Sequence, residues 1–322
     1  EWKKGESLTV EANENYWGEK PAIKEVTYRF IPDSNTLIAS LESGEVSFIY
    51  PPPDIGLLER LKGIDGAQVQ FKAGVIWEHL AFNLEKVPDL RIRQALAYGI
   101  DREQIVNELL KGQVNPLESW VMPDQKPYYT PAWEKYKYDK ARAKQLVDEA
   151  KAEGAKTEIT FSTTSDNRLR ETLQEVVQQQ LKDVGIDIKI KNTSATTFFG
   201  EWTVDGNFEL AEWAWLATPD PTQTILFSKD QIPTDDNPGG QNYYRYENDE
   251  VTRLLKESDK VLDERQRADL FKQAQNQMAE DLPIIPMYQR PDYYAFAENL
   301  TGPDVNPTLA GPFWNMGDWK LT

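Results

Sequence analysis

The chain has 322 residues, of which 39% are hydrophobic and 11% aromatic. This is enough apolar material for two ordinary domains with buried cores, and the aromatic content excludes a disordered chain. The 36 Lys and Arg residues stand against 53 Asp and Glu residues, and the resulting net charge of −17 disfavours nucleic-acid binding. No apolar run approaches the roughly 18–20 residues of a membrane-spanning helix.

Cysteine and histidine are the scarce residues. The absence of cysteine excludes disulfides, thiolate metal sites and cysteine nucleophiles, and it suits an exported bacterial protein. The single histidine, His79, excludes a multi-histidine metal site and disfavours a Ser/His/Asp triad, so we interpret it as a structural or half-exposed residue. We expect neither a metal nor a cofactor. Residues 1–5 carry no signal-peptide pattern, which indicates that a targeting segment has been removed or that the chain is a fragment.

The N-terminal part of the chain alternates between strands and helices, which predicts an α/β lobe. Glycines, prolines and capping aspartates set the expected ends of these elements. We predict strands over 7–12, 23–31, 45–50 and 75–83, and helices over 35–43, 89–100 and 101–110. A long irregular loop is expected over 116–131, where four prolines occur.

The remainder of the chain is also predicted to contain both helices and strands. We predict helices over 139–151, 167–184, 222–227, 248–260 and 264–281, and strands over 157–162, 186–190, 208–217 and 284–288. The helix over 167–184 has the clearest apolar stripe. A polar loop is expected over 229–241 and an irregular tail over 291–322.

Motifs for catalysis are absent from the sequence. It contains no phosphate-binding loop, no dinucleotide fingerprint and no nucleophile elbow. It also lacks a calcium loop with ligands at alternating positions and a closing Glu. A glycosidase-type pair of carboxylates cannot be recognised from sequence, so a carboxylate glycoside hydrolase stays open as the alternative from a different functional class.

The tryptophans are the strongest candidates for a binding site. Trp213 and Trp215 are two residues apart on a predicted strand and therefore project to the same face. The loop Thr218-Pro219-Asp220-Pro221 follows, and ligands bind at such strand ends in α/β sheets. Either indole could instead belong to the core. The site type stays open among sugars, peptides and cations. Four further tryptophans have weaker context: Trp77, Trp120, Trp202 and Trp314.

Residues 89–105 (DLRIRQALAYGIDREQI) resemble the signature of the family 5 extracellular solute-binding proteins, the oligopeptide- and dipeptide-binding components of bacterial ABC importers. Further matching pieces occur in the same order along the chain. They are 15–18 (NYWG), 80–83 (LAFN), 138–139 (YD), 180–186 (QLKDVGI) and 281–288 (DLPIIPMY). The ordered set is more specific than any one motif.

The resemblance implies a two-lobed clamshell of the periplasmic-binding-protein type (type II), with mixed α/β sheets flanked by helices. Its first lobe would comprise 1–80 and 286–322, and its second lobe 81–285, with hinge strands near 78–84 and 283–289. Family members are longer at the N-terminus. The resemblance therefore implies a C-terminal portion with an incomplete first lobe.

The resemblance also implies a function. The protein would be a non-enzymatic, extracytoplasmic binding protein that captures an oligopeptide between its lobes and delivers it to an ABC permease. The complete protein would be a lipid-anchored monomer. Peptide-binding members place an Asp just after the strand at 208–217, and here Thr218 or Asp220 takes that place, so an oligosaccharide ligand stays open. The expected ligand-binding residues are Trp213, Trp215, Thr218, Asp220, Trp77 and Asn83.

Overall fold

The computed structural model describes residues 1–52, 54–165, 167–304, 306 and 311–322. The chain forms two compact units, one made of 1–75 and 290–322 and the other of 76–289. The chain passes from one unit to the other within strands β5 (Ala67–Phe82) and β9 (Ile284–Ala297). The position of a hinge within these strands stays a prediction.

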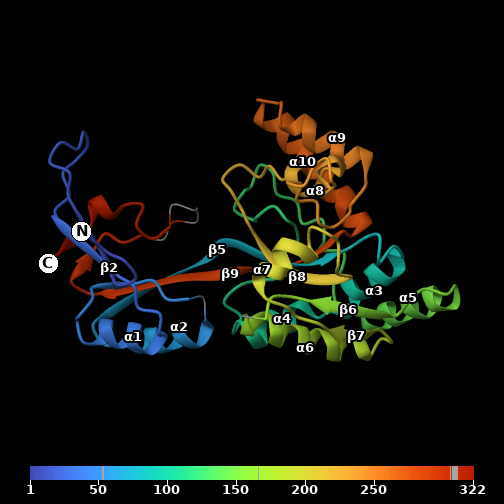
Figure 1. Cartoon of the computed structure of the whole chain (residues 1–322), viewed down its shortest axis with the longest axis horizontal. Helices are drawn as coiled ribbons and strands as arrows, with labels where there is room; N and C mark the ends of the chain where they lie inside the picture. Colours follow the sequence, from blue (N-terminus) through green and yellow to red (C-terminus); the bar gives the residue numbers. More distant parts are fainter. Residues whose placement is uncertain (53, 166, 305, 307–310) are drawn as a thin grey trace. The chain divides into compact units, whose positions relative to one another are not determined.

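Unit 1, which contains both ends of the chain, combines a small antiparallel sheet with two helices (Figure 1). The sheet has the order β1 (Trp2–Lys3), β2 (Ser7–Glu11) and β3 (Glu25–Arg29). Strand β4 (Phe48–Ile49) pairs with the end of β9. The C-terminal segment adds β10 (Leu300–Thr301), a 3-10 turn over Met316–Asp318 and β11 (Lys320–Leu321).

Helices α1 (Ser34–Glu42) and α2 (Ile55–Lys62) bury their apolar faces against β9 in a common core. The predicted helix over 35–43 is confirmed, whereas α2 was missed. Its signal is short but present, because Asp54 caps it by accepting from the Gly56 N–H at 2.7 Å and its apolar residues recur at helical spacing. The predicted strand over 45–50 is too long, because only the two residues of β4 form a strand there.

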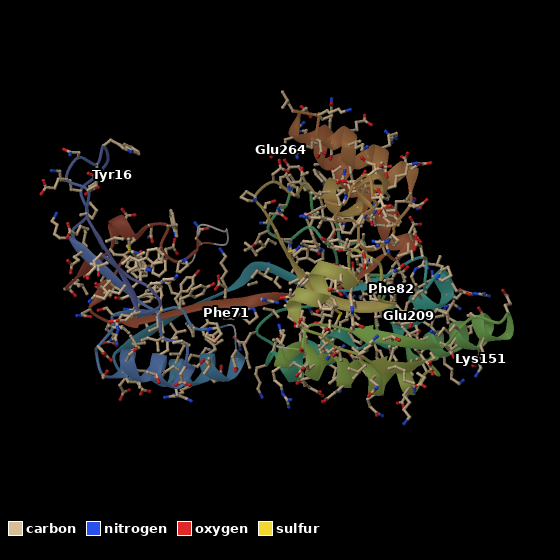
Figure 2. The ribbon with its side chains drawn as sticks, viewed as in Figure 1. Tyr16, Phe71, Phe82, Lys151, Glu209 and Glu264 are labelled. Carbon is tan, nitrogen blue, oxygen red and sulfur yellow. The ribbon has the colours of Figure 1, made fainter. Side chains whose placement is uncertain are left out.

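Unit 2 is built on a sheet in which β5 pairs antiparallel with β8 (Leu210–Leu216). Strand β6 (Glu158–Ser162) runs parallel to both β8 and β7 (Asp187–Ile190). Phe82 and Glu209, labelled in Figure 2, mark the end of β5 and the residue just before β8. Glu209 accepts from the Lys156 ammonium and from the Thr160 N–H, both at 2.6 Å, and thereby ties β8 to β6.

Helices cover unit 2 on two sides, as Figure 1 shows, with α4 and α6 beneath β6–β8 and α8, α9 and α10 grouped on the opposite side. Their bounds are α3 (Leu90–Gly99), α4 (Arg102–Leu109), α5 (Lys140–Ala152), α6 (Arg168–Lys182), α8 (Thr224–Phe227), α9 (Asp249–Ser258) and α10 (Glu264–Asp281). All seven predicted helices of this region are confirmed within a few residues. The sequence did not indicate α7 (Ala195–Thr197) or the π-helical turn over Phe198–Trp202.

The prediction of an irregular tail from residue 291 is wrong for its first part, because β9 continues to Ala297. Tyr293 and Ala295 are buried in the core of unit 1, and Phe296 pairs with Phe48. Burial and pairing therefore sustain the strand beyond Pro291, although proline cannot donate to the ladder. Residues 305 and 307–310 of the predicted tail lie outside the described residues.

Among the described ranges, no helix has both the length and the apolar character needed to cross a membrane.

Candidate functional site

The central feature of unit 2 is the antiparallel pair β5–β8, whose register places Trp77 opposite Trp215 and His79 opposite Trp213. Directly paired residues share a face of the sheet, and alternate residues on one strand do so as well. The four rings therefore form one aromatic face, and the prediction that Trp213 and Trp215 project to the same side is confirmed. Glu78 lies on the opposite face.

Two of the predicted site residues are buried on this aromatic face. Trp213 has 0% exposure, stacks on Tyr244 with ring centroids 5.6 Å apart, and meets His79 edge-on at 5.0 Å. Trp77 is also 0% exposed and lies 4.7 Å from the His79 ring. His79 itself is fully buried, so it is a structural residue and not a half-exposed one. Trp77 and Trp213 thus form the buried part of this aromatic face.

Trp215 is different, because its indole is only half-buried. It stacks on the half-buried Tyr243, with centroids 6.1 Å apart and planes within 17° of parallel. Its indole N–H donates to the Tyr244 hydroxyl at 2.9 Å. The Trp215–Tyr243 pair is therefore the partly exposed part of the aromatic face, whereas Trp77, His79 and Trp213 are buried.

The segment that carries Tyr243 and Tyr244 is held by its neighbours. Asn242 donates from its amide to the carbonyls of Ser228 at 3.1 Å and Tyr246 at 2.9 Å, and the Leu84 N–H donates to the Tyr244 carbonyl at 2.9 Å. These bonds fix the loop against the end of β5. Sequence reasoning missed both tyrosines, since neither belongs to a periodic element, and the adjacent Tyr-Tyr pair was the only available signal.

The loop after β8 carries the other two predicted residues on the surface, Thr218 and Asp220. The Asp220 carboxylate accepts from the Arg267 guanidinium at 2.6 Å and from the Thr222 hydroxyl at 2.8 Å. The hydrogen bond from Arg267 is the main reason that the pKa of Asp220 lies below its ordinary value. Gln125 braces the loop by donating to the Thr218 carbonyl at 2.8 Å. Asp220 would therefore meet a cationic solute only in competition with Arg267.

Asn83, the sixth predicted residue, is fully buried and caps a turn at the end of β5. Its amide donates to the Gly206 carbonyl at 2.9 Å, and its side-chain oxygen accepts from the Glu85 N–H at 3.1 Å. The structure therefore brings Trp215, Thr218 and Asp220 to the surface of unit 2 and buries Trp77, Trp213 and Asn83. Their contact with a solute stays a prediction.

The other three tryptophans of weaker context are not part of the β5–β8 pair. Trp120 is buried, Trp202 lies under the Lys191 ammonium at 4.8 Å, and Trp314 is 50% exposed in unit 1. Unit 1 also contains an apolar groove of about 590 Å³ between β3 and β4, and none of the six predicted residues lines it.

We expect Gly206→Ala to destabilise unit 2 by at least about 1 kcal/mol, because two costs combine there. Gly206 has φ +67°, and an added Cβ would lie 3.0 Å from the Arg245 guanidinium and 3.1 Å from the Asn83 amide. Gly154→Ala is the matched control, because Gly154 has φ +89° with nothing within 4 Å of the added Cβ. Urea unfolding should show the larger loss for Gly206→Ala. Equal losses would show that packing around Asn83 adds nothing.

On the opposite face of the β5–β8 pair, a buried arginine meets two buried glutamates. Arg170 from α6 forms a bidentate pair with Glu78, both N–O distances being 3.2 Å. Burial alone would lower the pKa of Arg170, but the negative charges of Glu78 and Glu212 outweigh it and raise that pKa. The guanidinium is therefore a fixed cation behind the aromatic face. Across the described residues, no three His, Cys, Asp or Glu side chains gather as a metal site.

The fold agrees with that of similar proteins. The model of the bacterial extracellular solute-binding proteins, family 5 (middle), matches residues 1–237. The chain therefore belongs to this family, as the resemblance in its sequence implied.

Individual relatives also support membership of this family. The chain is 29% identical to the oligopeptide-binding protein AppA of Bacillus subtilis, with all of this chain and 60% of the relative aligned. The solved structure of that AppA in complex with a nonapeptide matches with a TM-score of 0.78 and 27% identity, covering 100% of this chain and 65% of the other. DppA of Helicobacter pylori in complex with the peptide STSA matches with a TM-score of 0.77 and 25% identity, covering 99% and 61%.

These matches confirm the predicted fold class, the mixed α/β architecture of periplasmic peptide-binding proteins. The chain spans about 60% of the length of its relatives.

Proposed function

We propose that the protein is the solute-binding component of a bacterial ABC importer, that it captures peptides outside the cytoplasm and that it delivers them to a membrane permease. Family membership supports this proposal, and so do the relatives named as oligopeptide-binding or found with a bound peptide. The single observation that carries it to this chain is the half-buried Trp215–Tyr243 pair beside the loop at 217–222. A lipid anchor and a monomeric state stay predictions.

The proposed mechanism is an equilibrium between open and closed forms of the two lobes. A solute favours the closed form only to the extent that it gains contacts there, since a solute with equal affinity for both forms shifts nothing. The predicted hinge strands near 78–84 and 283–289 would carry this motion. Trp215 and Tyr243 would supply an aromatic wall for the solute, and Trp77 and Trp213 would complete the same face beside them. Asn83 would hold the turn at the end of β5.

We also propose that the solute leaves chemically unchanged. The chain has no cysteine, and its single histidine is fully buried and hydrogen-bonded to Tyr244, so neither a thiol nor an accessible imidazole is present for catalysis. Oligosaccharides are the second candidate ligands, because a flat aromatic pair such as Trp215–Tyr243 also suits the apolar face of a sugar.

We expect Trp215→Ala to weaken solute binding by about 1–3 kcal/mol, or roughly 5- to 150-fold, because truncation removes the aromatic wall. Isothermal titration calorimetry of the protein as its gene encodes it, with short and long peptides and with oligosaccharides, measures this loss. Trp314→Ala is the matched control, since Trp314 is an exposed tryptophan of unit 1, and it should leave the affinity unchanged. Unchanged affinity in a folded Trp215→Ala protein would place the site elsewhere.

A further inference from the structure

A chain of hydrogen bonds runs from the half-buried indole of Trp215 into the core of unit 2. The Trp215 N–H donates to the Tyr244 hydroxyl at 2.9 Å, and that hydroxyl lies 2.9 Å from Nε2 of His79. The three residues come from β8, the loop at 242–246 and β5, so the bonds join separate segments of the chain. His79 and Tyr244 are both fully buried.

Donor chemistry fixes the direction of the first bond, and burial favours one direction for the second. The indole nitrogen can only donate, so the Tyr244 oxygen accepts from it. The hydroxyl proton of Tyr244 is free to be donated to a lone pair on Nε2 of His79. With this direction, His79 is neutral and carries its proton on Nδ1. Burial favours these same neutral forms, because it lowers the pKa of His79 and raises that of Tyr244.

The Tyr244 ring has little freedom to move its hydroxyl. It is stacked between Trp213, at a centroid distance of 5.6 Å and an angle of 20°, and Phe227, at 5.2 Å and 22°. Such close packing holds a side chain in a single rotamer. The hydroxyl is therefore a fixed acceptor for the Trp215 N–H. The ring orientation that makes this bond also stacks the Trp215 indole on Tyr243.

We propose that Tyr244, oriented by His79, is a positioning residue that holds the Trp215 indole in the pose that a solute meets. This inference rests on the proposed function and extends it to two buried residues that do not touch the solute. A pre-positioned aromatic wall loses less conformational freedom on binding, and the saving appears as affinity.

The experiment reads the indole directly and needs no ligand for its first step. With ¹⁵N-labelled tryptophan, the Trp215 indole resonance is assigned by its loss in Trp215→Phe. We expect Tyr244→Phe to shift that resonance and speed its hydrogen exchange, and to weaken binding roughly 2- to 10-fold, the range for one lost hydrogen bond. His79→Leu, which removes the acceptor for Tyr244, should shift the resonance as well, whereas His79→Gln, which retains an acceptor, should shift it less.

Tyr136→Phe is the matched control. Tyr136 is also buried in unit 2, and its hydroxyl donates to the Ala279 carbonyl at 2.8 Å without touching Trp215. It should leave both the Trp215 resonance and the affinity unchanged. A Tyr244→Phe protein whose Trp215 resonance and affinity match those of Tyr136→Phe would overturn the inference, and so would a shifted resonance with unchanged affinity. If wild type binds no peptide or sugar, the proposed function fails, and the indole shift still reports whether the bond exists.

Discussion

Replacing Arg170 by methionine is expected to lower the free energy of unfolding by about 3–5 kcal/mol, the cost of leaving buried charges without their counter-ion. Arg170, Glu78 and Glu212 are 5%, 1% and 0% exposed, so water cannot compensate for the missing guanidinium. Chemical denaturation of unit 2, followed by tryptophan fluorescence, measures the loss.

Arg253→Met is the matched control for this prediction. Arg253 pairs with Glu250 at 2.7 Å on the exposed face of α9, where an ion pair contributes at most about 1 kcal/mol. The double variant Arg170→Met/Glu78→Gln should recover part of the loss, since it also removes one of the buried negative charges. If Arg170→Met cost no more than Arg253→Met, the guanidinium would not be the fixed cation behind the aromatic face.

The second large effect concerns pH. Burial, followed by the positive charge of Arg170, holds the pKa of His79 well below its ordinary value of 6.5. Below pH 6.5, His79 is therefore protonated in the unfolded chain but stays neutral in the folded chain. The free energy of unfolding falls as the pH falls. Between pH 7 and pH 5 this single group should remove about 2 kcal/mol from the free energy of unfolding.

Comparison with His79→Gln isolates that contribution, because glutamine does not titrate and all other groups are shared. The free energy of unfolding is measured for both proteins at pH 7 and pH 5, and the loss in the variant is subtracted from the loss in wild type. Wild type should lose about 2 kcal/mol more than the variant on acidification. Parallel curves would show that His79 takes up a proton in the folded state, which would also break the bond direction inferred for Tyr244.

Arg170 and His79 lie on opposite sides of the β5–β8 pair, one on helix α6 and the other on β5 itself. On one face Arg170 neutralises buried glutamates. On the other, His79 and Tyr244 anchor Trp215. The partly exposed Trp215 therefore has specific polar contacts on its own face of the strand pair, and a buried ion pair lies on the other face.

Much of the fold could be predicted because its signals are local. Asp89, Asp101, Asp139 and Asn167 each cap the helix that follows, and the register of β5 with β8 agrees with the expected face of Trp213 and Trp215. The full length of β9 could not be predicted, because pairing with β4 and burial in unit 1 sustain it beyond Pro291.

The candidate site was predictable only in part. The sequence does not distinguish two tryptophans on one face of a strand, yet Trp213 is fully buried and Trp215 is half-buried. This difference in burial depends on Tyr243 and Tyr244. Both tyrosines lie in a loop about thirty residues further along the chain, where the sequence has no periodic pattern. Asp220 resembled a free carboxylate, and its engagement by Arg267 depends on a helix far along the sequence.

The most direct test of the proposed function is to identify the solute that the protein retains. The protein as its gene encodes it is purified without unfolding and incubated with a peptide mixture, and the complex is weighed by native mass spectrometry. The bound fraction is then released with acid and weighed again. We expect one intact peptide per protein, with a mass unchanged after prolonged incubation. Release of shortened peptides or cleaved oligosaccharides, or the absence of any bound solute, would contradict a capture protein that delivers its solute unaltered.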